Sequence, residues 1–227
     1  MEFIESGTIR YVGVSNFSLE ELEKWSELIE TPSIQIPYNF LQRRIYDRIL
    51  AFCFSKQISI IAYTPLLMGL LTEKIRDKDF VHSGERVHVP SRILVECEKI
   101  VDNLSLIGER YGMTVAQLIL NWLVNQQGID CVLVGMSNVK HVKENIEGVE
   151  WRMPLNVKKI IDDIVAGVEA DLGDEFFTQK VRKVFNNYAG ETIAILEIGM
   201  KLIVTPNVKT DDIIKVNWYG EYLGKCI

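Results

Sequence analysis

The chain has 227 residues, 48% of them hydrophobic and 25% charged, a balance that is typical of a globular protein with a sizeable core and excludes a disordered chain. Its formal net charge of −6, without a dense Lys/Arg cluster, gives no indication of a nucleic acid or an anionic membrane surface as a partner. No apolar run reaches the roughly 18 to 20 residues needed to cross a bilayer, and the N-terminus lacks a secretory pattern, so we expect a cytoplasmic protein.

The first part of the chain alternates predicted strands and helices. Residues 9–17 are β-branched and aromatic, which predicts a strand. Ser18 and Glu21 then form a Ser-x-x-Glu capping box, which predicts that a helix begins directly behind this strand. A second short apolar run at 33–40 is followed by a helical pattern over 45–54, so the strand–helix unit repeats.

The alternation continues after a longer loop. Residues 58–66 are so uniformly apolar that they predict a strand covered on both faces, as in a parallel sheet. A looped segment over 67–91 leads into a predicted helix over 92–111. Thr114 is expected to cap an amphipathic helix, and residues 130–137 predict a fourth strand with a helix behind it.

Polar or small residues follow each of the four predicted strands. In chain order they are Ser15 and Asn16, Gln35 and Asn39, Tyr63 and Thr64, and finally Gly135, Ser137 and Asn138. Four strands that alternate with helices predict right-handed parallel crossovers, and binding groups collect at the carboxyl ends of such strands. Any one of these residues alone is explained by a turn or a helix cap, but four such groups together predict a site.

The chain beyond about residue 168 has a different pattern. Residues 157–168 and 176–188 carry apolar side chains at i, i+3/i+4 spacing, which predicts helices. Residues 191–206 and 212–223 are rich in β-branched residues and predict a small β unit, a hairpin or a meander. We therefore expect two domains, residues 1–168 and an extension over 169–227 that is a packing appendage, an interaction surface or residual coding sequence.

Five segments carry a resemblance to a known family: IRYVGVSNFS, IQIPYNFLQRR, IIAYTPLLMGLLT, MTVAQLILNWLV and VLVGMSNVKHVKEN. In order and spacing they resemble the second half of an aldo-keto reductase, over about residues 2–150. The resemblance implies an α/β fold, a partial TIM (β/α)8 barrel whose four strands correspond to the fifth to eighth. It also implies NADP as the cofactor, bound along the carboxyl ends of the strands, and the reduction of carbonyls to alcohols or the reverse oxidation.

The resemblance further implies which residues contact the cofactor. Ser15 and Asn16 would hydrogen-bond the nicotinamide carboxamide with Gln35 beside them, and Tyr63 would stack on the nicotinamide ring. The loop over the pyrophosphate would consist of Thr64, Leu66 and Gly69, with Leu70 and Thr72. The matching residues around the fourth strand are Gly135 and Ser137 near a phosphate, Glu144 and Asn145 at the adenine, and His141, with Lys140 adjacent, near the ribose 2′-phosphate.

Other readings of single residues stay open. Tyr63 could be a core tyrosine, Gln35 an interior polar group and His141 a solvated helix residue. His at the 2′-phosphate position is a weaker donor than the Arg fork, so NADP is favoured and NAD stays possible. Arg43 and Arg44 are expected to brace the helix that follows the second strand.

No metal or disulfide site is expected. His82 and His88 lie in a charged loop without further ligands at zinc spacing. The four cysteines show no CxxC spacing, and they are Cys53, Cys97, Cys131 and Cys226.

By resemblance, the proton donor of the family is a Tyr tuned by a Lys, an Asp and a His on the first half of the barrel. Those motifs are missing here, and the loss of a general acid costs about 10² to 10⁴ in rate. We assign no catalytic residue and expect a truncated or split form that acts on a small-molecule carbonyl substrate only when complemented. Its open sheet edges favour self-association or pairing with an N-terminal half barrel. A non-catalytic nicotinamide-dinucleotide-binding protein and an interaction protein are the alternatives.

Overall fold

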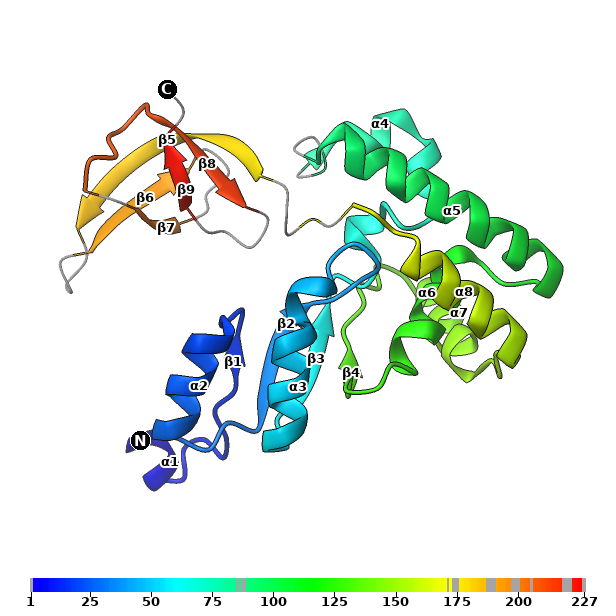
Figure 1. Cartoon of the computed structure of the whole chain (residues 1–227), viewed down its shortest axis with the longest axis horizontal. Helices are drawn as coiled ribbons and strands as arrows, with labels where there is room; N and C mark the ends of the chain where they lie inside the picture. Colours follow the sequence, from blue (N-terminus) through cyan, green and yellow to red (C-terminus); the bar gives the residue numbers. More distant parts are fainter. Residues whose placement is uncertain are drawn as a thin grey trace. The chain divides into compact units, whose positions relative to one another are not determined.

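The computed structural model describes residues 2–84, 86, 89–170, 172, 176–186, 191–196, 201–204, 206–217 and 222–225. The chain forms two compact units (Figure 1). Unit 1 consists of Met1–Val87 and Leu94–Glu169, and unit 2 consists of His88–Ile93 and Ala170–Ile227.

Unit 1 is built on a four-stranded parallel sheet. Its strands, in the spatial order β1-β2-β3-β4, are β1 (Val14–Ser15), β2 (Ser33–Pro37), β3 (Ser59–Tyr63) and β4 (Cys131–Val132). All three pairings are parallel, as predicted, although each strand is shorter than its apolar run. The register places Ser15 beside Gln35 and Pro37 beside Tyr63, so the carboxyl ends of the first three strands are neighbours.

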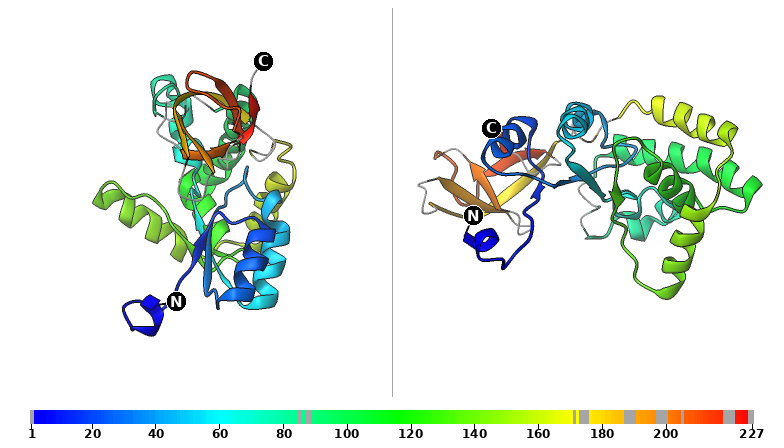
Figure 2. Two further views of the ribbon diagram at one scale, coloured as in Figure 1. Left: turned by 90° about the vertical axis from the view of Figure 1, so that its left-hand side faces the viewer. Right: turned by 90° about the horizontal axis from the view of Figure 1, so that it is seen from below.

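Helices precede, connect and follow the strands of unit 1. They are α1 (Glu2–Glu5), α2 (Leu19–Leu28), α3 (Asp47–Lys56), α4 (Lys78–Val81), α5 (Ser91–Tyr111), α6 (Val115–Val124), α7 (Val139–Glu150) and α8 (Leu155–Ala166). The views in Figures 1 and 2 agree that α2 and α3 cover the same face of the sheet. Within the described residues, no helix combines the length and the apolar character needed to cross a membrane.

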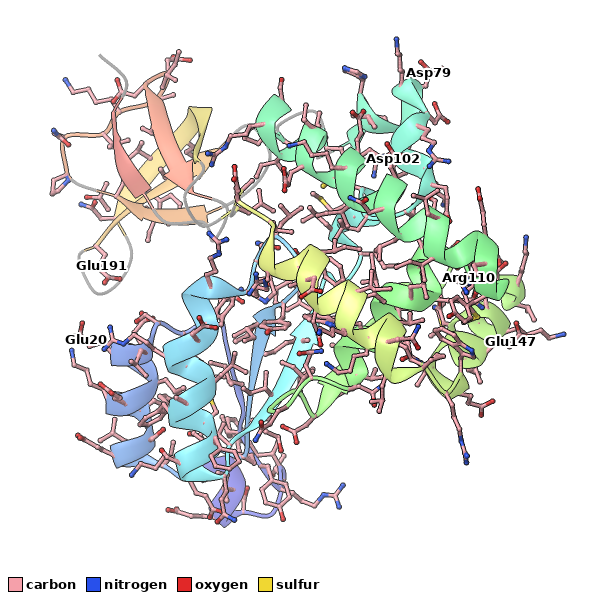
Figure 3. All side chains as sticks on the ribbon, turned by 45° about the vertical axis from the view of Figure 1, so that its right-hand side comes forward. Glu20, Asp79, Asp102, Arg110, Glu147 and Glu191 are labelled. Atoms are coloured by element: carbon pink, nitrogen blue, oxygen red, sulfur yellow. The ribbon has the colours of Figure 1, made fainter. Side chains whose placement is uncertain are left out.

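The predicted helix caps are present. Ser18 and Glu21 form both hydrogen bonds of a capping box at α2, and Thr114 and Gln117 do the same at α6. On α2, Leu22 is fully buried and Glu20 marks the outer, polar face (Figure 3). These caps satisfy amide groups that the first helical turn leaves without a partner, so they fix where each helix begins.

The segment predicted as a loop after β3 contains short helical turns. They are η2 (Leu67–Gly69), η3 (Glu73–Arg76) and α4, and an earlier turn, η1 (Arg44–Tyr46), precedes α3. Thr72 caps η3 and Asp77 caps α4 with its side chain. The part of the segment over 67–81 is therefore folded into short helical turns.

The core of unit 1 lies between the sheet and its helices. Ile34, Ile36 and Ile60 on β2 and β3 are almost completely buried. The rings of Phe40 and Trp122 pack edge to face with their centroids 4.9 Å apart. Burial of such side chains contributes about 1.5–3 kcal/mol each, which makes this layer the principal source of stability for the sheet.

Helix α7 is held against α6 by close backbone approach and by amide side chains. A Cβ at Gly148 would lie 2.8 Å from Cβ of Gln117, so only glycine permits this spacing. Gln117 Nε2 donates to Glu144 O over 2.9 Å. Asn121 Nδ2 donates to Gly148 O over 2.8 Å and to Trp151 O over 2.7 Å. These contacts determine where α7 places its N-terminal residues.

Arg43 and Arg44 are structural, but the helix that they brace was predicted wrongly. Arg43 Nη2 donates to Val165 O over 2.6 Å, and Arg44 Nη2 donates to Val168 O. Both carbonyls belong to the C-terminal end of α8 and the turn behind it, not to α3. Cationic groups bind there because the last carbonyls of a helix have no partner within the helix.

Unit 2 is a five-stranded antiparallel sheet. Its strands are β5 (Phe176–Asn186), β6 (Thr192–Leu196), β7 (Lys201–Val204), β8 (Ile213–Asn217) and β9 (Tyr222–Lys225), in the order β7-β6-β5-β8-β9. The sheet is strongly curled (Figure 2), and the edge strands β7 and β9 approach each other. This is a Greek-key arrangement of the kind found in small five-stranded OB-type barrels.

The prediction of a helix over 176–188 was wrong, because residues 176–186 form β5. Residues 187–188 lie outside the described residues. The N-terminal part of β5 pairs with β8 and its C-terminal part pairs with β6. Two neighbouring strands therefore supply the backbone hydrogen bonds of β5. This strand pairing outweighs the helical spacing of its valines in deciding the secondary structure. The segments 191–206 and 212–223, predicted as a β unit, contain the strands β6 to β9, while residues 197–200, 205 and 218–221 lie outside the described residues.

Candidate functional site

Four of the six residues predicted at the ends of the first three strands lie together, namely Ser15, Asn16, Gln35 and Tyr63. Ser15 Oγ donates to Gln35 O over 3.3 Å, and the amide of Asn16 donates to the same carbonyl over 3.0 Å. Tyr63 Oη donates to Asn16 Oδ1 over 3.0 Å. Ser15 and Asn16 are exposed, whereas Gln35 and Tyr63 are half-buried. We call this group the strand-end cluster.

Two features hold the strand-end cluster in place, the backbone turn at Asn16 and the protonated hydroxyl of Tyr63. Asn16 has a left-handed φ of 59°, which an Asn tolerates better than most residues and which turns the chain at the end of β1. Burial raises the pKa of Tyr63, and the hydrogen bond to Asn16 offsets only part of that rise. Tyr63 is therefore a neutral phenol at physiological pH, and its hydroxyl donates a hydrogen bond to Asn16 Oδ1.

A cavity of about 650 Å³ adjoins the end of β3. It is formed by the segment from Thr64 to Phe80, the N-terminal end of α6, the residues that follow β4 and the first turns of α7. Nine predicted residues line it, namely Thr64, Leu66, Gly69, Thr72, Gly135, Ser137, His141, Glu144 and Asn145. None of the described residues that line the cavity belongs to the strand-end cluster. The cluster and the cavity nevertheless adjoin, because Tyr63 of the cluster directly precedes Thr64 of the cavity.

The loop that begins the cavity has an unusual backbone. Thr64, Leu67 and Met68 have φ values of 51°, 46° and 54°, and Gly69 has a φ of 87°. Asn39 Nδ2 donates to Thr64 O over 3.1 Å and thereby fixes the first of these turns. Non-glycine residues in left-handed conformations cost energy, and such strain gathers where a loop must present groups to a ligand.

Two positions in this loop stand out, one for a missing hydrogen-bond partner and one for a close contact. Thr64 Oγ1 is buried and has no hydrogen-bond partner in the described part of the chain. A Cβ on Gly69 would lie 2.9 Å from Cζ of Phe80, so the ring and the loop are in close contact. Arg86 packs on the same ring, with its guanidinium carbon 3.9 Å from the Phe80 ring centroid.

Two helices begin at the cavity. Asn138 Oδ1 caps α7 by accepting from His141 N over 2.9 Å, and Ser137 Oγ lies 3.1 Å from Nδ1 of His141. At α6, Glu73 Oε1 accepts from Val115 N over 3.0 Å. Helix N-termini carry partial positive charge and free amides, which is the arrangement that binds anions such as phosphate.

Several cavity residues were not predicted from the sequence. They include Met68, Glu73, Lys74, Phe80, Thr114, Ala116, Leu133 and Met136. Thr114 was predicted as a helix cap, but its place at the cavity depends on how α6 packs beside β4, and nothing in the local sequence indicates that packing. Lys74 adds a cation to the cavity, while Glu73 and Glu144 add carboxylates.

The histidines and cysteines predicted to lack a site are placed as follows. His82 Nδ1 lies 2.7 Å from Lys78 O, and His88 lies outside the described residues. Cys53 and Cys97 are buried, Cys131 is exposed, and Cys226 lies outside the described residues. Burial raises the pKa of the Cys53 thiol to about 11. The residues that the structure describes contain no group of three potential metal ligands.

Comparison with known proteins places most of unit 1 in one family. The family model described as "Aldo/keto reductase family" matches residues 1–166. The aldo-keto reductase YhdN of Bacillus subtilis is 28% identical over 192 residues, which cover 80% of this chain and 57% of that protein. An NADH-specific methylglyoxal reductase of Escherichia coli is 28% identical over 148 residues, which cover 64% of this chain and 45% of that protein.

A solved structure agrees with this comparison. The thermostable aldo-keto reductase Tm1743, crystallised with the inhibitor epalrestat, superposes with a TM-score of 0.53 at 26% identity, over 72% of this chain and 51% of that one. The chain thus spans about half the length of the relatives that it matches. The parallel α/β organisation of unit 1 is that of a TIM-barrel-like fold.

Proposed function

Because the chain belongs to the aldo/keto reductase family, we propose that unit 1 binds a nicotinamide dinucleotide and is the cofactor-holding part of a carbonyl reductase. NADP is the favoured cofactor, and NAD is possible. In this proposal the four strands correspond to the second half of a TIM barrel. The observation that carries the proposal is the cavity, because nine of the residues predicted for the cofactor line it and four others form the adjoining strand-end cluster.

The chemistry of the site suits a dinucleotide. A cavity of about 650 Å³ lies within the range of roughly 300–1,000 Å³ that small-molecule sites occupy. The buried hydroxyl of Thr64 has no partner in the described part of the chain and can donate to a phosphate oxygen. A Cβ on Gly135 would meet no atom within 4 Å, so this wall leaves room for a ligand to approach the backbone.

Each end of the site suits a different part of the cofactor. Ser15, Asn16 and Gln35 offer hydroxyl and amide groups to the nicotinamide carboxamide, and Tyr63 offers a ring on which the nicotinamide can stack. The loop from Thr64 to Gly69 and the N-terminus of α7 offer hydroxyl and amide donors to the phosphates.

The preference for a 2′-phosphate is expected to be small. His141 contacts Ser137, and Nζ of Lys140 lies 3.5 Å from Oε1 of Glu144, so both candidate donors already have neighbours within α7 or its cap. Neither side chain has the planar guanidinium group of Arg, which binds a phosphate through two hydrogen-bond donors. The relative named as an NADH-specific reductase also supports keeping NAD as a candidate.

When bound, the cofactor supplies or accepts a hydride at the substrate carbonyl carbon. The residues of this chain bind the dinucleotide, orient the nicotinamide against Tyr63 and leave its other face for a small-molecule carbonyl substrate. The Tyr, Lys, Asp and His motifs that provide the proton are not matched within these 227 residues. Catalysis therefore requires groups from another polypeptide segment, and by itself the chain acts as a dinucleotide-binding protein.

A fluorescence titration tests the binding step. NADPH and NADH are added separately to the purified chain, and the expected result is saturable binding of both, with NADPH somewhat tighter. Tyr63→Ala is expected to weaken the change in nicotinamide emission, whereas Tyr111→Ala on α5 is the matched control. A flat titration with both nucleotides contradicts the proposed function.

A complementation assay tests the catalytic step. The chain is co-expressed with the first half of the YhdN relative, and aldehyde-dependent oxidation of NADPH is followed. Activity that requires both polypeptides and is lost in Asn16→Ala supports the reductase. Dinucleotide binding without activity in any complemented pair restricts the function to binding.

A further inference from the structure

Asn39, which follows the end of β2, is a buried side chain whose polar groups are all used. Its exposed fraction is 0%. Oδ1 accepts from Leu41 N over 3.0 Å, and Nδ2 donates to Gln42 Oε1 over 2.8 Å and to Thr64 O over 3.1 Å. An Asn amide carries two N–H donors and one carbonyl acceptor, so each of them has a partner here. Because a buried donor left without a partner is costly, the side chain is held in one orientation.

The bond from Asn39 reaches the first residue of the cavity loop. Thr64 O accepts from Asn39 Nδ2 and also from Leu67 N, the latter over 3.0 Å. Thr64 has a φ of 51°, which is strained for a β-branched residue and is kept only where surrounding contacts enforce it. The bond from Leu67 closes the turn, whereas the bond from Asn39 ties the turn to the end of β2. Asn39 therefore determines how the chain leaves β3 and enters the cavity wall.

The turn that carries Asn39 is anchored on α8. Gln42 N donates to Asn39 O over 3.1 Å, and the buried Gln42 side chain accepts from the Asn39 amide, so backbone and side-chain bonds close the turn together. The next two residues, Arg43 and Arg44, donate to carbonyls at the C-terminal end of α8 and in the turn behind it. A continuous series of hydrogen bonds and peptide bonds therefore runs from α8 through Asn39 to the backbone of the cavity loop.

We propose that Asn39 is a positioning residue of the dinucleotide site and that Arg43 holds it in place from α8. This inference rests on the proposed function, because it concerns the same site. In the described part of the chain, neither residue lines the cavity. Both act through Thr64, whose turn sets the positions of Leu66 and Gly69 in the cavity wall. A loop that already has its bound conformation loses less freedom when a ligand binds, so this preorganisation raises the affinity.

A positioning role differs from a purely structural role in what it predicts for folded molecules. A residue that only stabilises unit 1 changes the unfolding free energy, but the molecules that stay folded bind with unaltered affinity. A positioning residue also changes the affinity of the folded molecules. The free loop should respond as well, because the protein alone makes the bond from Asn39 to Thr64.

Titration of the full chain with NADPH tests the role of Asn39. Asn39→Asp keeps the shape of the side chain and the acceptor for Leu41 N but removes the donor to Thr64 O. The expected affinity for NADPH is roughly tenfold weaker, measured where circular dichroism shows the variant to be fully folded. Ile58→Ala is the matched control. This buried residue precedes β3 at the end of the strand opposite to the cavity, so its truncation should lower stability and leave the affinity unchanged.

Arg43 supplies a second test that does not depend on how Asn39→Asp folds. Arg43→Met is expected to weaken NADPH binding by roughly two- to fivefold. Arg43→Lys keeps a cationic donor for Val165 O and is expected to restore much of the affinity. In the free chain, the amide chemical shifts of Leu66 and Gly69 should move in Asn39→Asp and Arg43→Met but not in the control variant.

The outcomes separate this inference from the proposed function. If the unaltered chain binds NADPH and both Asn39→Asp and Arg43→Met bind it equally well, the positioning role is overturned and the dinucleotide site stands. An equal loss of affinity in Ile58→Ala also overturns the positioning role, since the loss would then follow stability. A flat titration of the unaltered chain overturns the proposed function, and the inference falls with it.

Discussion

The hydroxyl of Tyr63 donates to Asn16 Oδ1 over 3.0 Å and ties the end of β3 to the end of β1 across the intervening β2. The two residues are 47 positions apart in the chain, so only the parallel sheet brings them together. The contact shows that the strand-end cluster is assembled by unit 1 from its own strands.

Tyr63→Phe removes this hydrogen bond and keeps the ring. The expected loss in unfolding free energy is about 0.5–1.5 kcal/mol, because a net hydrogen bond is worth that much and Tyr63 is only half-buried. Urea unfolding measures the loss, with Tyr111→Phe as the control. NADPH is expected to bind Tyr63→Phe nearly as well as the unaltered chain, since the stacking surface is retained. Equal losses of stability in both variants would show that the bond to Asn16 contributes nothing.

Two glycines of the cavity should respond differently to an added side chain. Gly135→Val is expected to keep the stability of unit 1 and to weaken NADPH binding roughly tenfold, about 1.4 kcal/mol, because its side chain would enter open space in the cavity. Gly69→Ala is expected to reduce stability as well, because its φ is 87° and its Cβ would meet Phe80 at 2.9 Å. Thermal unfolding and fluorescence titration separate the two effects. Unchanged NADPH affinity in Gly135→Val would place the nucleotide elsewhere.

Arg43 is expected to stabilise unit 1 through α8. Arg43→Met removes a charge-assisted donor from Val165 O, and the expected cost is about 1.5–3 kcal/mol of unfolding free energy. Urea unfolding measures this cost. Arg48→Met, at an exposed position on α3, is the control and should change stability by less than about 0.5 kcal/mol. Similar values for both variants would contradict the assigned role of Arg43.

Asp162 should make the stability of unit 1 depend on pH. Partial burial pushes the pKa of Asp162 upward, but the hydrogen bonds from Lys158 and Trp122 outweigh it and bring the pKa below its ordinary value of 3.8. Since the folded-state pKa is lowered, the stabilisation is fully present above 3.8 and is lost as the pH falls through the folded-state pKa.

Asp162→Asn is therefore expected to be less stable than the unaltered chain at neutral pH, with a difference that shrinks below 3.8. Urea unfolding followed by tryptophan fluorescence measures this difference, because Trp122 Nε1 donates to Asp162 Oδ1 over 2.7 Å. Asp163→Asn, at an exposed neighbouring position, is the control. A difference that stays constant over the whole pH range would contradict this account.

Local patterns predicted the elements of unit 1 well. The capping box at Ser18 depends on residues three positions apart and forms as predicted, and Thr114 caps α6 as predicted, with Gln117 completing a capping box that was not predicted. The alternation of strands and helices predicted the parallel sheet, and with it the approach of Ser15, Gln35 and Tyr63, because parallel strands must end at one edge.

Long-range packing accounts for the failures. Arg43 binds a carbonyl 122 positions away, which no local pattern reveals. The β5 segment has both helical spacing and β-branched residues, and pairing with β6 and β8 decides its structure. Lys74 and Thr114 reach the cavity only because the segment after β3 folds against the start of α6.

The central claim is that one dinucleotide lies along the carboxyl edge of the sheet, from the strand-end cluster to the N-terminus of α7. Amide chemical shifts of isotope-labelled chain during an NADPH titration test it most directly. We expect saturable shifts at Asn16, Gly69, Gly135 and Ser137 with one common affinity. Shifts confined to unit 2, or affinities that differ between the two ends of the site, would contradict it.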